Sequence, residues 1–163
     1  MRGMILGLLA GLLLYHLASV FLLAPMITPV FSPYEGDEII RMIDDAETSI
    51  DIEVYAFTSR DIVDALERAR FRGVSIRIIL EKINPEMHDE LLSKGFNARY
   101  APGIYKTTHS KIMIVDGKKV LVGSHNFSNS ALFKNREASV ILTDMKTAQE
   151  FISEFEMDWA LSS

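Results

Sequence analysis

The sequence predicts an α/β protein in which helices sandwich a mixed β-sheet, preceded by an apolar amino-terminal segment. Segments that alternate like strands take turns with segments of helical spacing over most of the chain, which favours a sheet covered by helices. Late in the chain an Asp-Gly pair joins two apolar strands and predicts a hairpin, which adds antiparallel strands to the sheet. A long uncharged run at the start is typical of a membrane-spanning helix.

The amino-terminal run from Met4 to Ala24 is nearly continuous apolar sequence. As a helix its 21 residues would span roughly 31 Å, so residues 1–24 are expected to be a transmembrane anchor. A cleaved signal peptide is the alternative, but the run is long for one and no clean Ala-x-Ala site precedes Pro25. Arg2 before the run and the acidic residues after it favour a single-pass protein whose folded domain lies outside the cytoplasm. Cleavage would make the domain secreted or periplasmic.

Three prolines in residues 25–33 predict an extended linker, and the folded domain is then expected over residues 34–163. The first segment of that domain, 38–47, has helical spacing of its isoleucines. Residues 49–57, SIDIEVYAF, alternate between apolar and polar types and predict a strand.

A helix is expected over residues 61–72, because Ile62, Leu66 and Ala69 form one apolar stripe that Gly73 ends. The remaining segments before the hairpin are predicted to be a strand, a helix closed by a glycine and a short strand, at residues 74–80, 85–94 and 97–101.

The predicted hairpin joins strands 111–115 and 120–123 through Asp116-Gly117-Lys118-Lys119. A further strand is expected over residues 137–142. The closing segment, 146–161, is predicted to be a helix whose core face carries three aromatic residues spaced by four: Phe151, Phe155 and Trp159.

Two pairs of polar side chains are expected to meet on this hairpin. His109 and Lys111 are two residues apart and share a face of their strand, as do Ser124 and Asn126. With Gly117 and Lys118 as the turn, paired positions sum to 235, which sets His109 opposite Asn126 and Lys111 opposite Ser124. A shift of the turn by one residue would change the partners but keep the two pairs adjacent.

These residue types suit the chemistry of a phosphodiester. A neutral imidazole can attack phosphorus, and a lysine ammonium neutralises a phosphoryl oxygen. The serine and asparagine side chains can donate hydrogen bonds to equatorial oxygens in the transition state. The chain has no cysteine, and no second histidine or carboxylate is expected in the patch, so neither a metal nor another cofactor is predicted.

The neighbouring residues are expected to have structural roles. Asp116 stands at an odd offset from Lys111, which predicts that it faces away from the patch and holds the turn. His125, between two patch residues, should point to the opposite face and pack there or lie at the surface. His88 is expected to be a solvated helix residue.

The pattern H-x-K-x4-D-G followed by G-S-x-N resembles the signature of the phospholipase D superfamily. Its residues here are His109, Lys111, Asp116, Gly117, Gly123, Ser124 and Asn126. The resemblance extends from about Pro33 to Trp159 and implies the phospholipase D-like fold with a single motif per chain. The chain resembles the small single-motif nucleases and the mitochondrial cardiolipin hydrolase branch, whose cysteine-containing zinc insertion it lacks.

The resemblance implies a role for each catalytic residue. His109 would form a phosphohistidine, Lys111 and Asn126 would bind the phosphoryl oxygens with help from Ser124, and Glu137 would fix the tautomer of His109. Asp116, Gly117 and Gly123 would be structural. One motif supplies one histidine, whereas the reaction needs a nucleophile and a general acid, so a homodimer with a shared site is expected.

The charge distribution points to a polyanionic substrate. From Lys94 to Arg136, eight basic residues stand against one acidic residue. Single-stranded DNA or RNA is therefore the preferred substrate, cleaved without base specificity. The alternatives are an anionic phospholipid such as cardiolipin, and an inactive module that binds polyanions. The residues expected to contact substrate are Ser124, Lys118, Lys119, Lys134 and Arg136.

Overall fold

The computed structural model describes residues 26–163 and the isolated positions 7 and 11, so the anchor expected at residues 1–24 lies outside the described residues except for those two glycines. No helix within the described part is long and apolar enough to cross a membrane. In chain order the elements are β1 (Met26–Phe31), α2 (Asp37–Asp44), β2 (Ser49–Val54), α3 (Arg60–Phe71), β3 (Ser75–Leu80), α4 (Pro85–Ser93), β4 (Asn97–Tyr100), β5 (Lys111–Val115), β6 (Lys119–Gly123), α5 (Asn129–Phe133), β7 (Ala138–Thr143) and α6 (Met145–Leu161).

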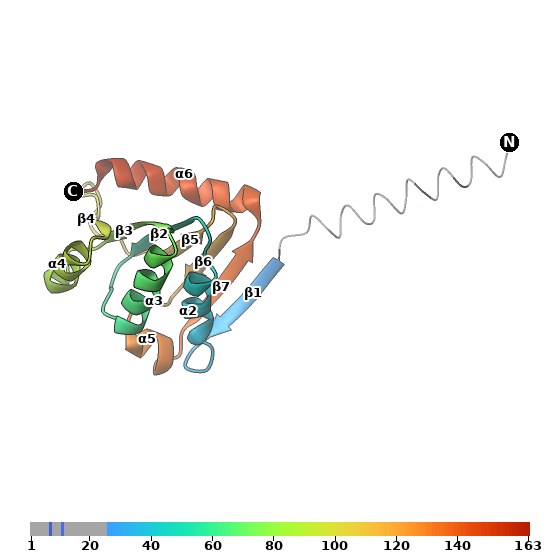
Figure 1. The fold of residues 1–163 in the computed structure, drawn as a ribbon, viewed down its shortest axis with the longest axis horizontal. Helices are drawn as coiled ribbons and strands as arrows, with labels where there is room; N and C mark the ends of the chain where they lie inside the picture. Colours follow the sequence, from blue (N-terminus) through green and yellow to red (C-terminus); the bar gives the residue numbers. More distant parts are fainter. Residues whose placement is uncertain (1–6, 8–10, 12–25) are drawn as a thin grey trace.

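The strands form a mixed sheet, as the sequence predicts. Its order is β1-β7-β6-β5-β2-β3-β4 (Figure 1). β2, β3 and β4 run parallel, whereas β5 is antiparallel to β2 and begins the antiparallel half of the sheet. Helices cover both faces: α2 and α3 lie on one side and α6 on the other (Figure 1).

Alternation along the strands builds a core on each face. On the α2–α3 face, Ile50, Ile52 and Val54 of β2 are fully buried against Ile43 of α2 and Leu66 of α3. The smaller core beneath α6 consists of Ile79, Ile114, Val120, Ala148 and Phe155. Phe155 and Trp159 pack there with ring centroids 5.8 Å apart, as the predicted aromatic stripe requires.

The segment expected to be a linker contains a strand of the sheet. β1 pairs antiparallel with β7, from Met26 opposite Thr143 to Phe31 opposite Ala138. The prolines in this segment argued against a strand, because proline has no N–H to donate to a neighbouring strand. β1 lies at the sheet edge, where Pro29 needs no hydrogen bond on its solvent side. The catalytic domain therefore begins at β1, and the free linker expected over residues 25–33 is corrected.

The hairpin register differs by one residue from the predicted one. Val115 pairs with Lys119 and Ile112 with Val122, so paired positions sum to 234. Asp116 and Gly117 both adopt positive φ, 54° and 62°, and the N–H of Lys118 donates to the carbonyl oxygen of Val115 over 3.1 Å. The loop is thus Asp116, Gly117 and Lys118, so Asp116 is the additional loop residue, and this shifts every partner by one position.

Candidate active site

His109 and Lys111 meet where the chain enters β5. The Lys111 ammonium lies 3.1 Å from Nδ1 of His109 and donates to the His109 carbonyl oxygen over 2.6 Å. Lys111 is buried, whereas the imidazole of His109 is exposed. Burial lowers the pKa of Lys111, and the charge of Glu137 opposes that shift.

This contact sets the tautomer of His109. An ammonium group can only donate hydrogen bonds, so Nδ1 of His109 accepts from Lys111 and the imidazole proton resides on Nε2. A nucleophile needs a free lone pair on the nitrogen that attacks, and a histidine that acts as a general acid is protonated on both nitrogens. In this tautomer the Nε2 atom of His109 has no free lone pair.

Tyr55 completes the surroundings of His109. Its ring centroid lies 4.4 Å from that of His109, and the Lys111 ammonium lies 5.2 Å from its centroid. Tyr55 follows β2, the strand next to β5, and its N–H bonds to the carbonyl oxygen of Ser110. The sequence did not single out Tyr55 by itself, although its position at the end of a strand of alternating pattern was an available signal.

Ser124 and Glu137 form the second part of the site. The Ser124 hydroxyl donates to Oε2 of Glu137 over 2.5 Å and accepts from the N–H of Ala138 over 3.0 Å. The hydrogen bond from Ser124 lowers the pKa of Glu137; burial opposes this, and Asn135, His125 and Lys111 lower the pKa further. The carboxylate is therefore ionised at neutral pH.

The hydrogen bond expected between Glu137 and His109 is not formed. The two Glu137 oxygens accept instead from Ser124 and from Nδ2 of Asn135, the latter over 3.1 Å. Ser32, immediately after β1 and fully buried, holds this segment: its hydroxyl donates to the Asn135 carbonyl oxygen and accepts from the Glu137 N–H. Because Ser32 belongs to the segment interpreted as a linker, its positioning role was not predicted.

Asn126 is half-buried and lies three residues after the end of β6. Its Oδ1 atom is buried and has no hydrogen-bond partner among the described residues. The next residue is fixed by the backbone, because the N–H of Phe127 bonds to the Ala56 carbonyl oxygen over 2.9 Å. A buried polar atom without a partner normally costs stability, so Oδ1 is available to a ligand that donates, whereas a phosphoryl oxygen would be held by the Nδ2 group of the same amide.

The other two histidines named from the sequence are both buried. His125 points away from Ser124 into the fold, as predicted, and is 1% exposed, with Nδ1 lying 2.7 Å from the Ser139 hydroxyl. Burial lowers the pKa of His125, and Glu137 opposes that shift. His88, expected to be solvated, is 8% exposed and stacks on Tyr100 with ring centroids 3.9 Å apart. That expectation was wrong because the helix face that carries His88 packs against β4.

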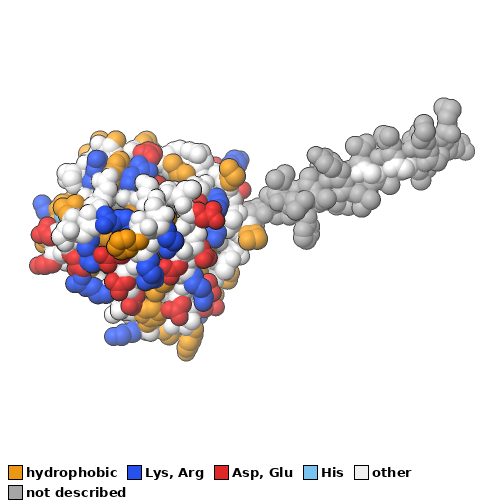
Figure 2. All heavy atoms as spheres, viewed as in Figure 1, with side chains coloured by type: hydrophobic (Ala, Val, Ile, Leu, Met, Phe, Trp, Pro, Cys, Tyr) orange, Lys and Arg blue, Asp and Glu red, His pale blue; other side chains and the backbone are white. Residues whose placement is uncertain are grey.

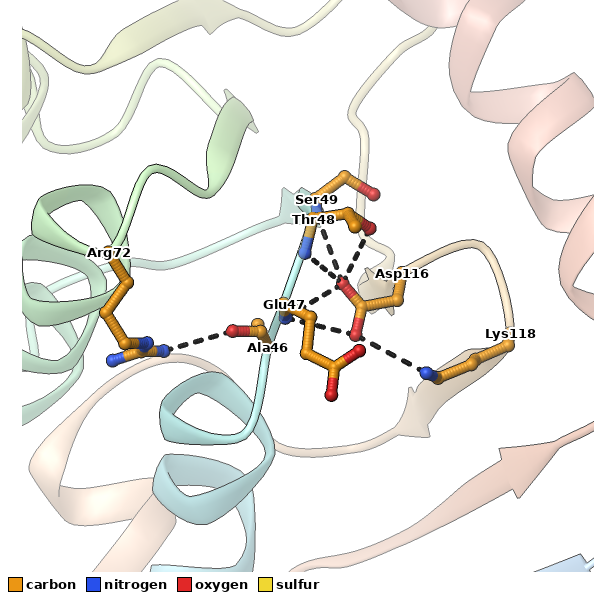
Figure 3. Close-up of polar contacts among 7 residues, drawn as sticks. All are labelled: Ala46, Glu47, Thr48, Ser49, Arg72, Asp116 and Lys118. Carbon is orange, nitrogen blue, oxygen red and sulfur yellow. Dashed lines mark hydrogen bonds and ion pairs between the residues drawn. The ribbon is translucent and has the colours of Figure 1, made fainter.

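Asp116 lies at the opposite end of the hairpin and ties the turn to the start of β2. Its carboxylate accepts from the backbone N–H groups of Glu47, Thr48 and Ser49 and from the Thr48 hydroxyl, over 2.7–3.2 Å (Figure 3). Burial works to raise the pKa of Asp116, but these hydrogen bonds outweigh it and leave the pKa below its usual value. Asp116 has no contact with His109 or Lys111.

The expected basic surface divides between the two ends of the sheet. Lys118 and Lys119 lie in and beside the turn, ~20 Å along β5 from His109, so they cannot contact the same phosphate. Lys134 and Arg136 are exposed between α5 and β7, at the end where Ser124 and Glu137 lie. On the face drawn in Figure 2, basic and acidic side chains are interspersed, without a single basic stripe.

A carboxyl group beneath the His109 segment was also missed. Glu53 of β2 is buried and accepts a hydrogen bond from the Ser110 hydroxyl, next to His109. Burial raises the pKa of Glu53 to about 7; the bond from Ser110 opposes this rise, and Asp158 of α6 adds to it. The described part of the chain contains no cluster of three or more histidine, cysteine or acidic residues that could hold a metal.

An exposed imidazole lies beside a lysine, with serine, asparagine and a carboxylate at the same sheet end, which is a set of groups suited to a phosphodiester. Residues 39–159 match the family described as "Cardiolipin synthase, PLD-like domain", and the chain belongs to that family. It is a phosphoric diester hydrolase of the phospholipase D superfamily.

Named relatives agree with this family. "Phospholipase D" of Rickettsia felis is 34% identical over 136 residues, covering 80% of this chain and 68% of that protein. "Mitochondrial cardiolipin hydrolase" of Mus musculus is 29% identical over 125 residues, covering 74% and 49%. The chain thus spans about two thirds or less of these relatives. The phospholipase D family member Nuc from Salmonella typhimurium superposes with a TM-score of 0.80 at 28% identity, covering 86% of this chain and 97% of that one.

Proposed function

We propose that this protein is a metal-independent endonuclease that cleaves single-stranded DNA or RNA through a phosphohistidine at His109. The observation that carries the mechanism is the contact of an exposed imidazole with the Lys111 ammonium, at the sheet end where Ser124 and Asn126 also lie. Lys111 and the Asn126 amide bind the phosphoryl oxygens, and Ser124 assists. The imidazole displaces one ester oxygen, and water then releases the phosphate from His109.

A homodimer completes the site. The reaction needs an unprotonated imidazole nitrogen on one side of phosphorus and a protonated imidazole at the leaving oxygen on the other. One chain supplies one exposed site histidine, His109. Two copies about a two-fold axis bring one histidine of each kind to a shared phosphodiester. When the protein is diluted below the dissociation constant of the dimer, turnover should be lost. Sedimentation at the same concentrations should show the dimer dissociating into monomers.

Nucleic acid is favoured by the openness of the site and by its extent. His109 and Ser124 are exposed, with Lys106, Lys134 and Arg136 exposed on neighbouring loops, so a long polyanion can cross the site. Tyr55 beside His109 and the half-exposed Tyr105 provide aromatic faces on which bases can stack. The chain also matches nearly the whole of Nuc, but only part of the named phospholipases.

Hydrolysis of an anionic phospholipid is the second candidate, because relatives carry the names phospholipase D and mitochondrial cardiolipin hydrolase. A membrane anchor at residues 1–24, with the catalytic domain outside the cytoplasm, belongs to the same proposal and is supported by the apolar run from Met4 to Ala24. Both candidates use the same residues and the same phosphohistidine.

The test offers the purified full chain labelled single-stranded DNA, RNA, duplex DNA and cardiolipin vesicles, each with and without EDTA. Single-stranded nucleic acid should be cut at the same rate in EDTA, and His109→Ala should abolish cutting. Turnover of cardiolipin alone would replace the first candidate by the second. Salt-sensitive binding without any turnover would leave only a polyanion-binding module.

A further inference from the structure

The two ends of the sheet have opposite surroundings, and β1 connects them. Thr143 of β7 pairs with Met26 on one side and with Lys119 on the other, so the first residue of β1 lies level with the hairpin turn. At the other end of β1, Phe31 pairs with Ala138, whose N–H bonds to Ser124. β1 therefore begins at the turn end of the sheet and finishes at the active-site end.

Little chain separates β1 from the apolar run. The run ends at Ala24 and β1 begins at Met26, so only Pro25 lies between them. One residue reaches no more than about 3.6 Å, and the ladder between β1 and β7 fixes the following residues to the sheet. A bilayer that held the run would therefore lie against the turn end. A single residue between the run and β1 is too short for the domain to reorient relative to that bilayer.

The side chains at the turn end suit the surface of an anionic bilayer. Three large apolar side chains are largely exposed there: Met26 at 66%, Ile27 at 61% and Met145 at 75%. Lys118, Lys119 and Lys146 stand among them, and the N–H of Asp144 bonds to the Lys118 carbonyl oxygen, which joins the turn to the start of α6. Figure 1 shows the starts of β1 and α6 on one side and α5 at the other end of β1.

Acidic groups also lie at the turn end, and one of them, Asp116, has the Lys118 ammonium 3.8 Å away. Asp116 is saturated by backbone N–H groups, and Asp144 caps α6 by accepting from the Thr147 N–H over 2.7 Å. Asp45 and Glu47 are exposed beside this surface: Asp45 lines the same pocket as Met26 and Lys119, and the Glu47 N–H bonds to Asp116. Apolar side chains interleaved with lysines are typical of protein surfaces that lie on anionic headgroups.

We propose that this turn-end surface, formed by Met26, Ile27, Lys118, Lys119, Met145 and Lys146, rests on the anionic bilayer that holds the apolar run. The inference rests on the anchor in the proposed function and extends it to the substrate. His109 then stands roughly 20 Å from the headgroups, at the far end of the strands. The site faces away from its own membrane, so its substrate is a phosphodiester supplied from the aqueous side and not a lipid of that bilayer.

Single-cysteine labelling tests the orientation cleanly because the chain contains no cysteine. Full chains carrying Met145→Cys or Ser130→Cys, the latter exposed in α5 beside the site, receive an environment-sensitive dye. They are reconstituted into vesicles of phosphatidylcholine and phosphatidylglycerol that contain headgroup-linked quenchers. The dye at position 145 should lose its fluorescence and the dye at position 130 should keep it. Quenching at position 130, or at neither position, would overturn the proposal.

Charge reversal tests the lysines. Lys118→Glu with Lys119→Glu, added to the position-145 label, should reduce its quenching, as should vesicles of phosphatidylcholine alone. Lys134→Glu is the matched control at the site end and should leave the quenching unchanged. Equal quenching in all of these would refute a role for the lysines. Neither experiment depends on turnover, so inactivity of a correctly oriented chain would count against the proposed function and leave the orientation standing.

Discussion

The two ends of the β5–β6 hairpin carry residues of one sequence motif but have opposite hydrogen-bonding states. At the turn end, the Asp116 carboxylate is saturated by three backbone N–H groups and a hydroxyl (Figure 3). At the site end, His109 is exposed and Asn126 keeps a buried oxygen without a partner in the described part of the chain. A satisfied end stabilises the fold, whereas an unsatisfied end keeps its polar groups available for substrate.

The largest expected effect is on the site end. His109→Ala should lower kcat for a simple phosphodiester such as bis(4-nitrophenyl) phosphate by at least about 10³-fold, because the nucleophile and the acid are both lost. The melting temperature should stay within error, since the imidazole is exposed. Retention of a tenth of the activity would show that another group attacks phosphorus.

A pair of lysines on the same hairpin sharpens the comparison. Lys111→Met should lower kcat roughly 10²-fold by removing the cation from the phosphoryl oxygens. Lys118→Met, at the turn end, is the matched control and should change kcat less than about twofold, because its ammonium lies next to Asp116. Equal losses in the two variants would contradict the division of the hairpin into two ends.

The turn end should respond in stability. Asp116→Ala leaves the N–H groups of residues 47–49 without their acceptor and should lower the free energy of unfolding by about 2–4 kcal/mol in a urea titration. Asp45→Ala, exposed in the same loop, is the control and should change it by less than about 0.5 kcal/mol. The folded fraction of the Asp116 variant should keep its kcat.

The sign of the pH dependence follows from the Asp116 pKa. Because that pKa is lowered in the folded state, Asp116 stabilises the protein above its usual value of 3.8, and this contribution is lost as the pH falls further through the folded-state pKa. The acid-induced loss of stability should therefore be shallower in Asp116→Ala.

The smallest effect is expected at Glu53, between the two ends. Its pKa is raised to about 7, so the protonated form stabilises the fold fully below pH 4.5 and the contribution disappears as the pH rises through about 7. Glu53→Gln should therefore flatten the fall in melting temperature over this range and be more stable than the parent at alkaline pH. An unchanged pH profile would show that Glu53 ionises normally.

Local patterns predicted most of the fold. Alternation located β2 and β3, glycines located the ends of α3 and α4, and Asp-Gly located the hairpin. β1 was missed because its prolines mimic a linker and its pairing with β7 is set by residues more than 100 positions away. The turn register depended on one extra loop residue, Asp116, which the pattern cannot distinguish from the last paired residue of the hairpin.

The site was predicted by residue type and spacing, but its contacts were not. His109, Lys111, Ser124 and Asn126 do lie at one sheet end, because the hairpin places the residues before β5 and after β6 at the same end. The partner of Glu137 and the places of Lys118 and Lys119 depend on tertiary geometry. Summing charge along the sequence placed those lysines at the site, whereas the strand length carries them to the other end.

Trapping the reaction intermediate tests the central claim most directly. The full chain is mixed with a labelled phosphodiester, quenched in alkali within the first turnover and digested for mass spectrometry, with Lys118→Met as a competent control. The account predicts a phosphoryl group on the peptide that contains His109, attached to the imidazole and lost in acid. Turnover without such a peptide, or with label on a different residue, would contradict it.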